Sequence, residues 1–158
     1  QNYQNNTMTQ TALLFDLEST GLLRRGSQIH CIVARDLSQA DKPLVWDVPR
    51  NDVAEGIERL RNADVLIGHN IIGYDVPVLE RLLGIDFSSC KITDTLVLSR
   101  LTDPSREGGH SLDNWGQRLG FPSNQGRGQA SAERLFERQA LLPATLVRPS
   151  WVRSSDAR

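Results

Sequence analysis

The chain has 158 residues, of which 39% are hydrophobic and 23% charged, and its formal net charge at pH 7 is -1. This length is typical of a single domain with a sizeable buried core. A membrane-spanning class is excluded because no run of about 18 apolar residues exists. A basic, apolar, small-residue leader for export is also absent, so we expect a cytoplasmic protein.

In the first part of the chain, apolar residues recur with the period of two that is typical of β-strands. Residues 1–10 are polar, aperiodic and rich in Asn and Gln, and we expect them to form a disordered leader. Strands are predicted at Thr11–Glu18, Gln28–Arg35 and Pro43–Val48. Because the connections between them are short and polar, these strands are expected to pair as an antiparallel meander.

Beyond Val48 the apolar residues change to a helical period, interrupted by buried strands. The predicted elements are a helix capped by Asn51 or Asp52, a strand at Ala63–Gly68, a helix from Tyr74 or Asp75 to Gly84, a helix at Thr95–Leu101 capped by Asp94, and a helix at Leu112–Leu119 closed by Gly120. A meander followed by alternating helices and strands predicts an α/β sandwich around a mixed sheet.

Acidic residues stand where several predicted strands end. Asp16 and Glu18 alternate with apolar residues, so both are expected on one face of their strand, where convergent oxygens bind hard cations such as Mg²⁺. Asp75 and Asp94 follow later strands, whose ends share one edge of a sheet. Two plainer interpretations stay open. An Asp-x-Glu pair is common on the solvent face of an edge strand, and Asp94 is better explained as a helix N-cap.

Four segments of the chain follow the order and spacing of the motifs of one protein family: Asp16–Gly21, Gly68–Pro77, Asp94–Leu101 and Gly109–Gly120. They resemble the 3′-to-5′ proofreading exonuclease domain of phage family A DNA polymerases, and the resemblance covers residues 11–121. It implies a ribonuclease H-like three-layer fold, with a mixed five-stranded sheet flanked by helices, in the superfamily of exonucleases with four catalytic acids.

The resemblance implies two-metal hydrolysis of the 3′-terminal phosphodiester of single-stranded DNA. Two Mg²⁺ or Mn²⁺ ions about 4 Å apart would hold the scissile phosphate, one activating the water and the other stabilising the leaving oxygen. From the matching positions in the family, the resemblance implies that Asp16 would bridge both ions and that Glu18 would hold the first ion and its water. Asp75 would complete the set of metal ligands.

The same resemblance implies the substrate contacts and the partners. The backbone of Thr20 and Gly21, with Leu22 beside it, matches the family's cradle for the terminal nucleotide, and Asn70 matches its side-chain contact to the substrate. Contacts of this kind do not read base sequence. A polymerase domain or subunit is an implied partner, and for a phage protein the implied location is the host cytoplasm.

The tail, residues 122–158, departs from the family's pattern. It carries six Arg, no Lys and three acids, whereas residues 1–121 carry 12 basic and 16 acidic residues. It lacks the Tyr-x-x-x-Asp motif, or its His-x-x-x-x-Asp counterpart, that supplies the fourth carboxylate, so activity is expected to be weak or absent. Two explanations stay open: a truncation or shifted reading frame, and a helix begun by Ser131 in which Glu133 or Glu137 replaces the missing acid.

Three functions therefore compete. The first is a metal-dependent 3′-to-5′ exodeoxyribonuclease, possessing the early motifs but weakened by the missing acid. The second is a non-catalytic DNA-binding remnant of a polymerase proofreading domain. The third is an RNA-degrading or junction-cleaving nuclease, against which the Ser-Thr-Gly-Leu cradle at residues 19–22 argues.

Overall fold

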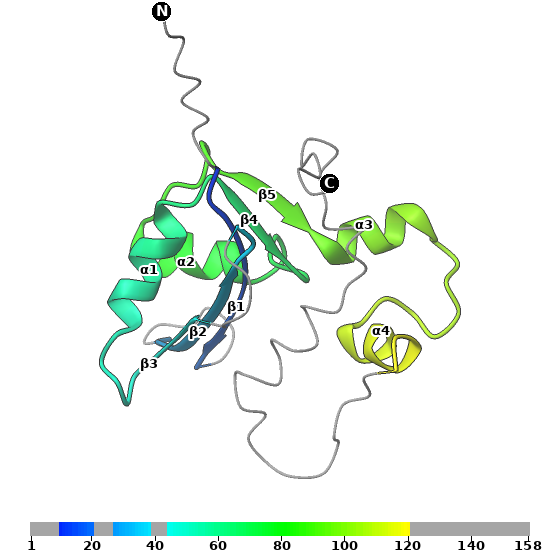
Figure 1. Ribbon diagram of the computed structural model, residues 1–158, viewed down its shortest axis with the longest axis horizontal. Helices are drawn as coiled ribbons and strands as arrows, with labels where there is room; N and C mark the ends of the chain where they lie inside the picture. Colours follow the sequence, from blue (N-terminus) through cyan, green and yellow to red (C-terminus); the bar gives the residue numbers. More distant parts are fainter. Residues whose placement is uncertain (1–9, 21–26, 39–43, 121–158) are drawn as a thin grey trace, which may run out of the picture.

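The computed structural model of the protein describes residues 10–20, 27–38 and 44–120 (Figure 1). Most of the predicted leader and the tail, together with Gly21 and Leu22 of the predicted cradle, lie outside these ranges. No helix in the described part of the chain is long and apolar enough to cross a membrane.

Five strands form one sheet. In chain order they are β1 (Ala12–Ser19), β2 (Ile29–Asp36), β3 (Leu44–Asp47), β4 (Val65–Gly68) and β5 (Lys91–Asp94). Their spatial order is β3-β2-β1-β4-β5, with β2 antiparallel to both β1 and β3, and β4 parallel to both β1 and β5. The predicted mixed five-stranded sheet is therefore confirmed, and β1 is its central strand.

In the described part of the chain, four helices accompany the sheet: α1 (Val53–Arg61), α2 (Asp75–Leu83), α3 (Thr95–Thr102) and α4 (Leu112–Arg118). In Figure 1, α1 and α2 lie on one side of the sheet, and α3 and α4 continue from the end of β5. Gly84 ends α2 with a φ of 64°, as predicted. Asp52 occupies the N-cap position of α1, one of the two residues predicted for it, but its side chain accepts a hydrogen bond from Asp47 N (2.7 Å) and none from the helix.

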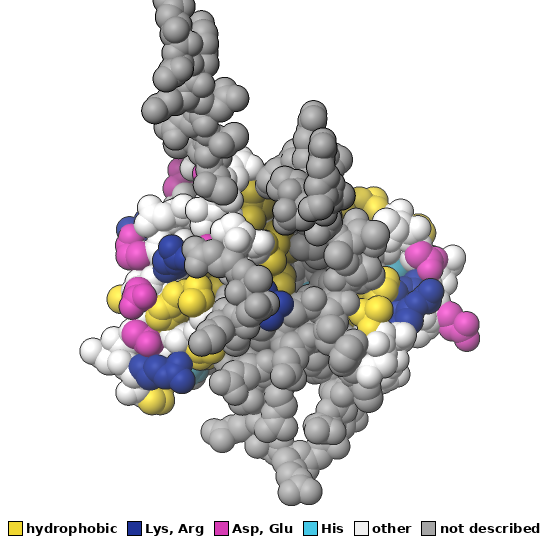
Figure 2. All heavy atoms as spheres, in the orientation of Figure 1, with side chains coloured by type: hydrophobic (Ala, Val, Ile, Leu, Met, Phe, Trp, Pro, Cys, Tyr) yellow, Lys and Arg dark blue, Asp and Glu magenta, His cyan; other side chains and the backbone are white. Residues whose placement is uncertain are grey.

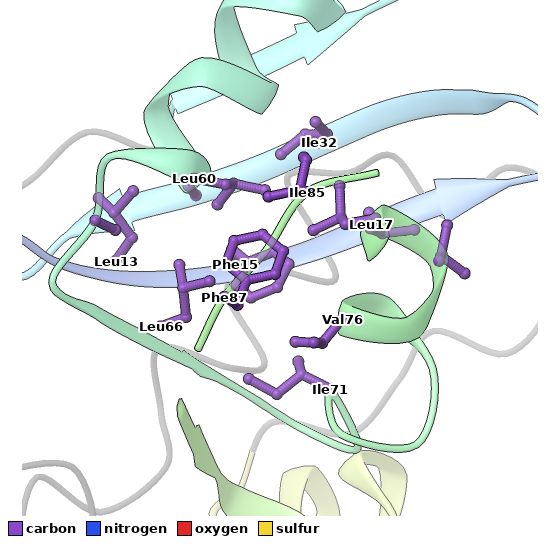
Figure 3. Close-up of a cluster of buried hydrophobic side chains, with 14 of the residues drawn as sticks. Leu13, Phe15, Leu17, Ile32, Leu60, Leu66, Ile71, Val76, Ile85 and Phe87 are labelled. Carbon is purple, nitrogen blue, oxygen red and sulfur yellow. The ribbon is translucent and has the colours of Figure 1, made fainter. Parts of the chain in front are cut away.

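The main core lies between the sheet and α1 and α2 (Figure 3). Leu13, Phe15 and Leu17 of β1 are at most 5% exposed and join one cluster with Leu60 of α1 and Val76 of α2. Full burial of such a side chain contributes about 1.5–3 kcal/mol. The alternating side chains of β1 therefore anchor the central strand to the helices, and the intervening residues face the other way.

Candidate active site

Asp16 and Glu18 lie on the face of β1 opposite the main core. Successive side chains of a strand alternate between faces, so the burial of Phe15 and Leu17 turns both carboxylates to the other side. Asp16 is half-buried and Glu18 is exposed. The register between β1 and β2 shifts between Glu18 and Ser19, and such irregularities redirect side chains at strand ends.

Asp75 reaches β1 from the start of α2. It is 3% exposed, and its Oδ1 accepts a hydrogen bond from Leu17 N at 3.2 Å. On β1, the ladder to β4 runs only from Ala12 to Leu14, so the Leu17 N–H lies beyond it and meets this carboxylate. Burial and, second, the negative charge of Asp16 raise the pKa of Asp75 to about 8. This raised pKa favours the protonated form of Asp75 when no cation is bound.

The neighbouring carboxylates of Asp16 and Asp75 are suited to a divalent cation, since a positive charge would relieve their repulsion and oxygen atoms are the ligands such ions prefer. Negative charge extends along this end of the sheet: burial, followed by Asp47 and Glu18, raises the pKa of Cys31 to about 11. Within the described ranges, however, no three His, Cys, Asp or Glu side chains converge closely enough to hold a metal ion. The fold brings Asp16 to Asp75 and leaves Glu18 at the exposed strand end.

The predicted substrate contacts lie at two loops. Thr20 is exposed and joined to the chain before β2, because its N donates to Gln28 O at 2.9 Å and its Oγ1 accepts from Gln28 N at 2.8 Å. Asn70 is exposed in the loop after β4. The hydroxyls of Ser19 and Tyr74, 2.6 Å apart, join the end of β1 to the residue before Asp75. Nothing in the sequence pattern marks that link.

The end of β4 packs tightly against its neighbours. A Cβ on Gly68 would lie 2.3 Å from Ile71 Cγ2 and 2.8 Å from Phe15 O, so glycine is required for this approach. The Thr95 hydroxyl donates to Gly68 O at 3.1 Å and lies 3.0 Å from His69 Nδ1. Burial lowers the pKa of His69. His69 is therefore a packed, hydrogen-bonded residue.

Asp94 caps α3, as predicted, and also binds the loop that follows β4. Its Oδ1 accepts from Leu96 N at 2.8 Å and from Asn70 N at 3.0 Å, and its Oδ2 accepts from Ile72 N at 3.0 Å. The contacts to the loop join residues 24 and 22 positions apart. A local motif predicts the cap, but no local motif predicts the second role.

A stacked Arg–Trp pair connects α4 to the segment before it. The Arg106 guanidinium lies 3.4 Å from the centroid of the Trp115 ring, whose Nε1 donates to Ser99 Oγ at 3.0 Å. Arg106 is 8% exposed, and its Nε has no hydrogen-bond acceptor among the residues described. It lines an open hollow of about 370 Å³ with Glu107, Gly108, Asn114, Gln117 and Arg118. No local sequence pattern marks this pair, because Arg106 and Trp115 meet only once α4 packs against the segment before it.

Comparisons with known proteins relate the chain to polymerases. No family model matches it. The DNA-directed DNA polymerases of Escherichia phage T7 and Enterobacteria phage T3 are each 28% identical to it, over 80% of this chain. The chain spans about a fifth of their length, 21% of each polymerase. The predicted resemblance to phage DNA polymerases is thereby confirmed.

Solved structures with a similar fold come from nucleases and polymerases. E. coli exonuclease I in complex with a 5cy-dT13 oligonucleotide has a TM-score of 0.57 and 15% identity, over 87% of this chain and 40% of its own. The family B DNA polymerase of the archaeon Pyrobaculum calidifontis has a TM-score of 0.52 and 16% identity, over 86% of this chain and 21% of its own. The chain therefore has the predicted ribonuclease H-like fold, with its mixed five-stranded sheet.

Proposed function

We propose that the protein is a metal-dependent 3′-to-5′ exonuclease domain that removes nucleotides from the 3′ end of single-stranded DNA. The observation that carries this proposal is the buried Asp75 carboxyl beside Asp16 at the end of the central strand. A carboxyl group whose pKa is raised by burial and by a second carboxylate is typical of a site that receives positive charge. The phage polymerase relatives and the exonuclease-like fold support the same class of reaction.

We assign metal binding to Asp16, Glu18 and Asp75. Divalent ions such as Mg²⁺ or Mn²⁺ supply activation of water and stabilisation of the charge on the leaving oxygen. The protein's own contribution is orientation, since the hydrogen bond from Leu17 N holds the Asp75 carboxylate toward β1. Because Asp75 is protonated when no metal is present, metal uptake at neutral pH should release this proton.

We assign the DNA contacts to Asn70 and Thr20, with Gly21 and Leu22 completing the cradle. Figure 2 displays basic and acidic side chains beside one another on the described surface in view. Arg106 is a further candidate for a phosphate contact, because its guanidinium stacks on Trp115 and it lines the open hollow beside α4. Bidentate guanidinium groups are well suited to phosphate.

Replacing Arg106 with alanine is expected to weaken binding of single-stranded DNA and to reduce its salt dependence. Loss of one phosphate contact lowers the slope of log affinity against log salt by about 0.7. Fluorescence anisotropy of labelled oligothymidylate at several salt concentrations measures this slope. The exposed Arg81 on α2 provides the control Arg81→Ala, which should leave the slope unchanged. Equal slopes for wild type and Arg106→Ala would contradict the assignment.

The proposed reaction is tested by direct digestion. A 5′-labelled single-stranded DNA incubated with Mg²⁺ should shorten stepwise from its 3′ end, and EDTA should stop the reaction. RNA and blunt duplex DNA of the same sequence should be degraded more slowly, because the cradle accepts an unpaired DNA terminus. Internal cleavage, or equal digestion of RNA, would contradict the proposal.

A DNA-binding domain without hydrolysis is the second candidate function. It is favoured by the lack of three converging metal ligands in residues 10–20, 27–38 and 44–120. Binding of single-stranded DNA with no digestion in Mg²⁺ would support it, and a calorimetric titration with Mn²⁺ should then detect at most one weak site. For either function we infer a polymerase context, in the cytoplasm of an infected host, from the phage relatives.

A further inference from the structure

Asp94 accepts hydrogen bonds from two separate segments. Two donors are in the first turn of α3, Leu96 N at 2.8 Å and Val97 N at 3.4 Å. Two are in the loop between β4 and α2, Asn70 N and Ile72 N, both at 3.0 Å. Asp94 is 5% exposed. One buried carboxylate therefore caps a helix and holds the loop that carries Asn70.

The backbone of Asn70 has an unusual conformation that such hydrogen bonds stabilise. Its φ is 66°, in the left-handed region that few residues other than glycine adopt. Its carbonyl accepts from Gly73 N at 3.0 Å and Tyr74 N at 3.1 Å. Its side-chain amide lies against Gly73, where a Cβ would be 2.5 Å from Asn70 Oδ1. The direction of the Asn70 side chain thus depends on the loop backbone, which Asp94 holds by two N–H groups.

We propose that Asp94 is a positioning residue that orients Asn70 toward single-stranded DNA by holding the backbone of this loop. The inference rests on the proposed function, because it takes Asn70 as a DNA contact. A carboxylate is required at position 94, since Oδ1 and Oδ2 must both accept at once, from Asn70 and from Ile72. An amide has one acceptor oxygen, and a hydroxyl is too short to reach both segments.

The Asp94→Ser variant separates the two roles. Serine is a good N-cap, so α3 keeps its cap while the loop loses both acceptor oxygens. We expect faster amide hydrogen exchange at Asn70 and Ile72, with Leu96 still protected, and about tenfold weaker binding of labelled oligothymidylate in EDTA. Asp94→Asn, which keeps one acceptor oxygen, should give an intermediate loss.

A matched control is available at Asp86, whose carboxylate accepts from Ser88 N and Oγ in an exposed turn. Asp86→Ser removes the same charge and a similar local hydrogen bond without touching the loop. It should change neither DNA binding nor exchange at Asn70. An equal loss of affinity in Asp86→Ser and Asp94→Ser would overturn the proposal, because net charge alone would then explain the effect.

A double-mutant cycle with Asn70→Ala tests whether Asp94 acts through Asn70. If it does, adding Asp94→Ser to Asn70→Ala should weaken DNA binding by less than about twofold further. Additive losses would overturn the proposal, as would equal affinity of wild type and Asp94→Ser. Binding in EDTA without digestion in Mg²⁺ would overturn the proposed reaction alone. Absence of binding by the wild-type protein would overturn both.

Discussion

The Asp75→Asn variant is expected to melt at a higher temperature than the wild-type protein when divalent metal is absent. Folding raises the pKa of Asp75 from 3.8 to about 8, so at neutral pH the buried carboxylate must take up a proton. Taking up this proton lowers the free energy of unfolding by on the order of 2–4 kcal/mol at pH 7. Asparagine is neutral and similar in shape, and it keeps an oxygen for Leu17 N. The melting temperature should rise by roughly 5–10 °C.

The pH dependence of this effect has a definite sign. Because the folded state binds the Asp75 proton more tightly than the unfolded chain, the stability that Asp75 contributes is greatest below its unfolded pKa. It is lost as the pH rises through the range between 3.8 and about 8. The difference in melting temperature between variant and wild type should therefore widen across this range and then remain constant.

Circular dichroism melts in EDTA at several pH values measure this difference. Asp86→Asn is the control, because hydrogen bonds from Ser88 lower the pKa of Asp86 and its replacement should give no stabilisation. Mg²⁺ should stabilise the wild-type protein and not Asp75→Asn, since only the wild type gains a ligand by losing the proton. A difference that does not change with pH would show that Asp75 is not the titrating group.

The Asp16→Asn variant is expected to lose DNA hydrolysis while it still binds DNA. The charge of Asp16 is close enough to raise the pKa of Asp75, which makes these two carboxylates the electrostatic centre of the described site. Loss of a residue that merely supports a metal ligand costs about 10- to 100-fold. Loss of the ligand itself should cost at least about 100-fold in rate.

Single-turnover digestion of 5′-labelled DNA measures the rate, and anisotropy in EDTA measures binding. Glu80→Gln is the matched control, because Glu80 is an exposed acid on the same helix as Asp75. A second readout follows from charge: without Asp16, the pKa of Asp75 should fall, so the melting curves should depend less on pH. Unchanged hydrolysis by Asp16→Asn would assign the cleavage to another site or to a contaminating nuclease.

The elements that could be predicted depend on short-range geometry. The alternation of apolar residues predicted the position of β1. It also predicted that Asp16 and Glu18 share one face, because adjacent side chains of a strand face opposite ways. Gly84 and Asp94 marked the boundaries of α2 and α3. Asp52 likewise marked the start of α1, although its carboxylate accepts from Asp47 N and not from the helix. The sequence therefore locates an N-cap residue, whereas the donors that its side chain meets depend on how neighbouring segments pack.

The sequence by itself determined which carboxylates lie at the ends of the strands and which family of nucleases they resemble. Only the tertiary structure decided that Asp75 is buried near Asp16 with a raised pKa, and that Asp94 holds the loop of Asn70. It also placed Arg106 on the face of Trp115. Alternation and capping arise within a few bonds of the backbone, whereas burial, charge proximity and long-range hydrogen bonds exist only once distant segments pack together.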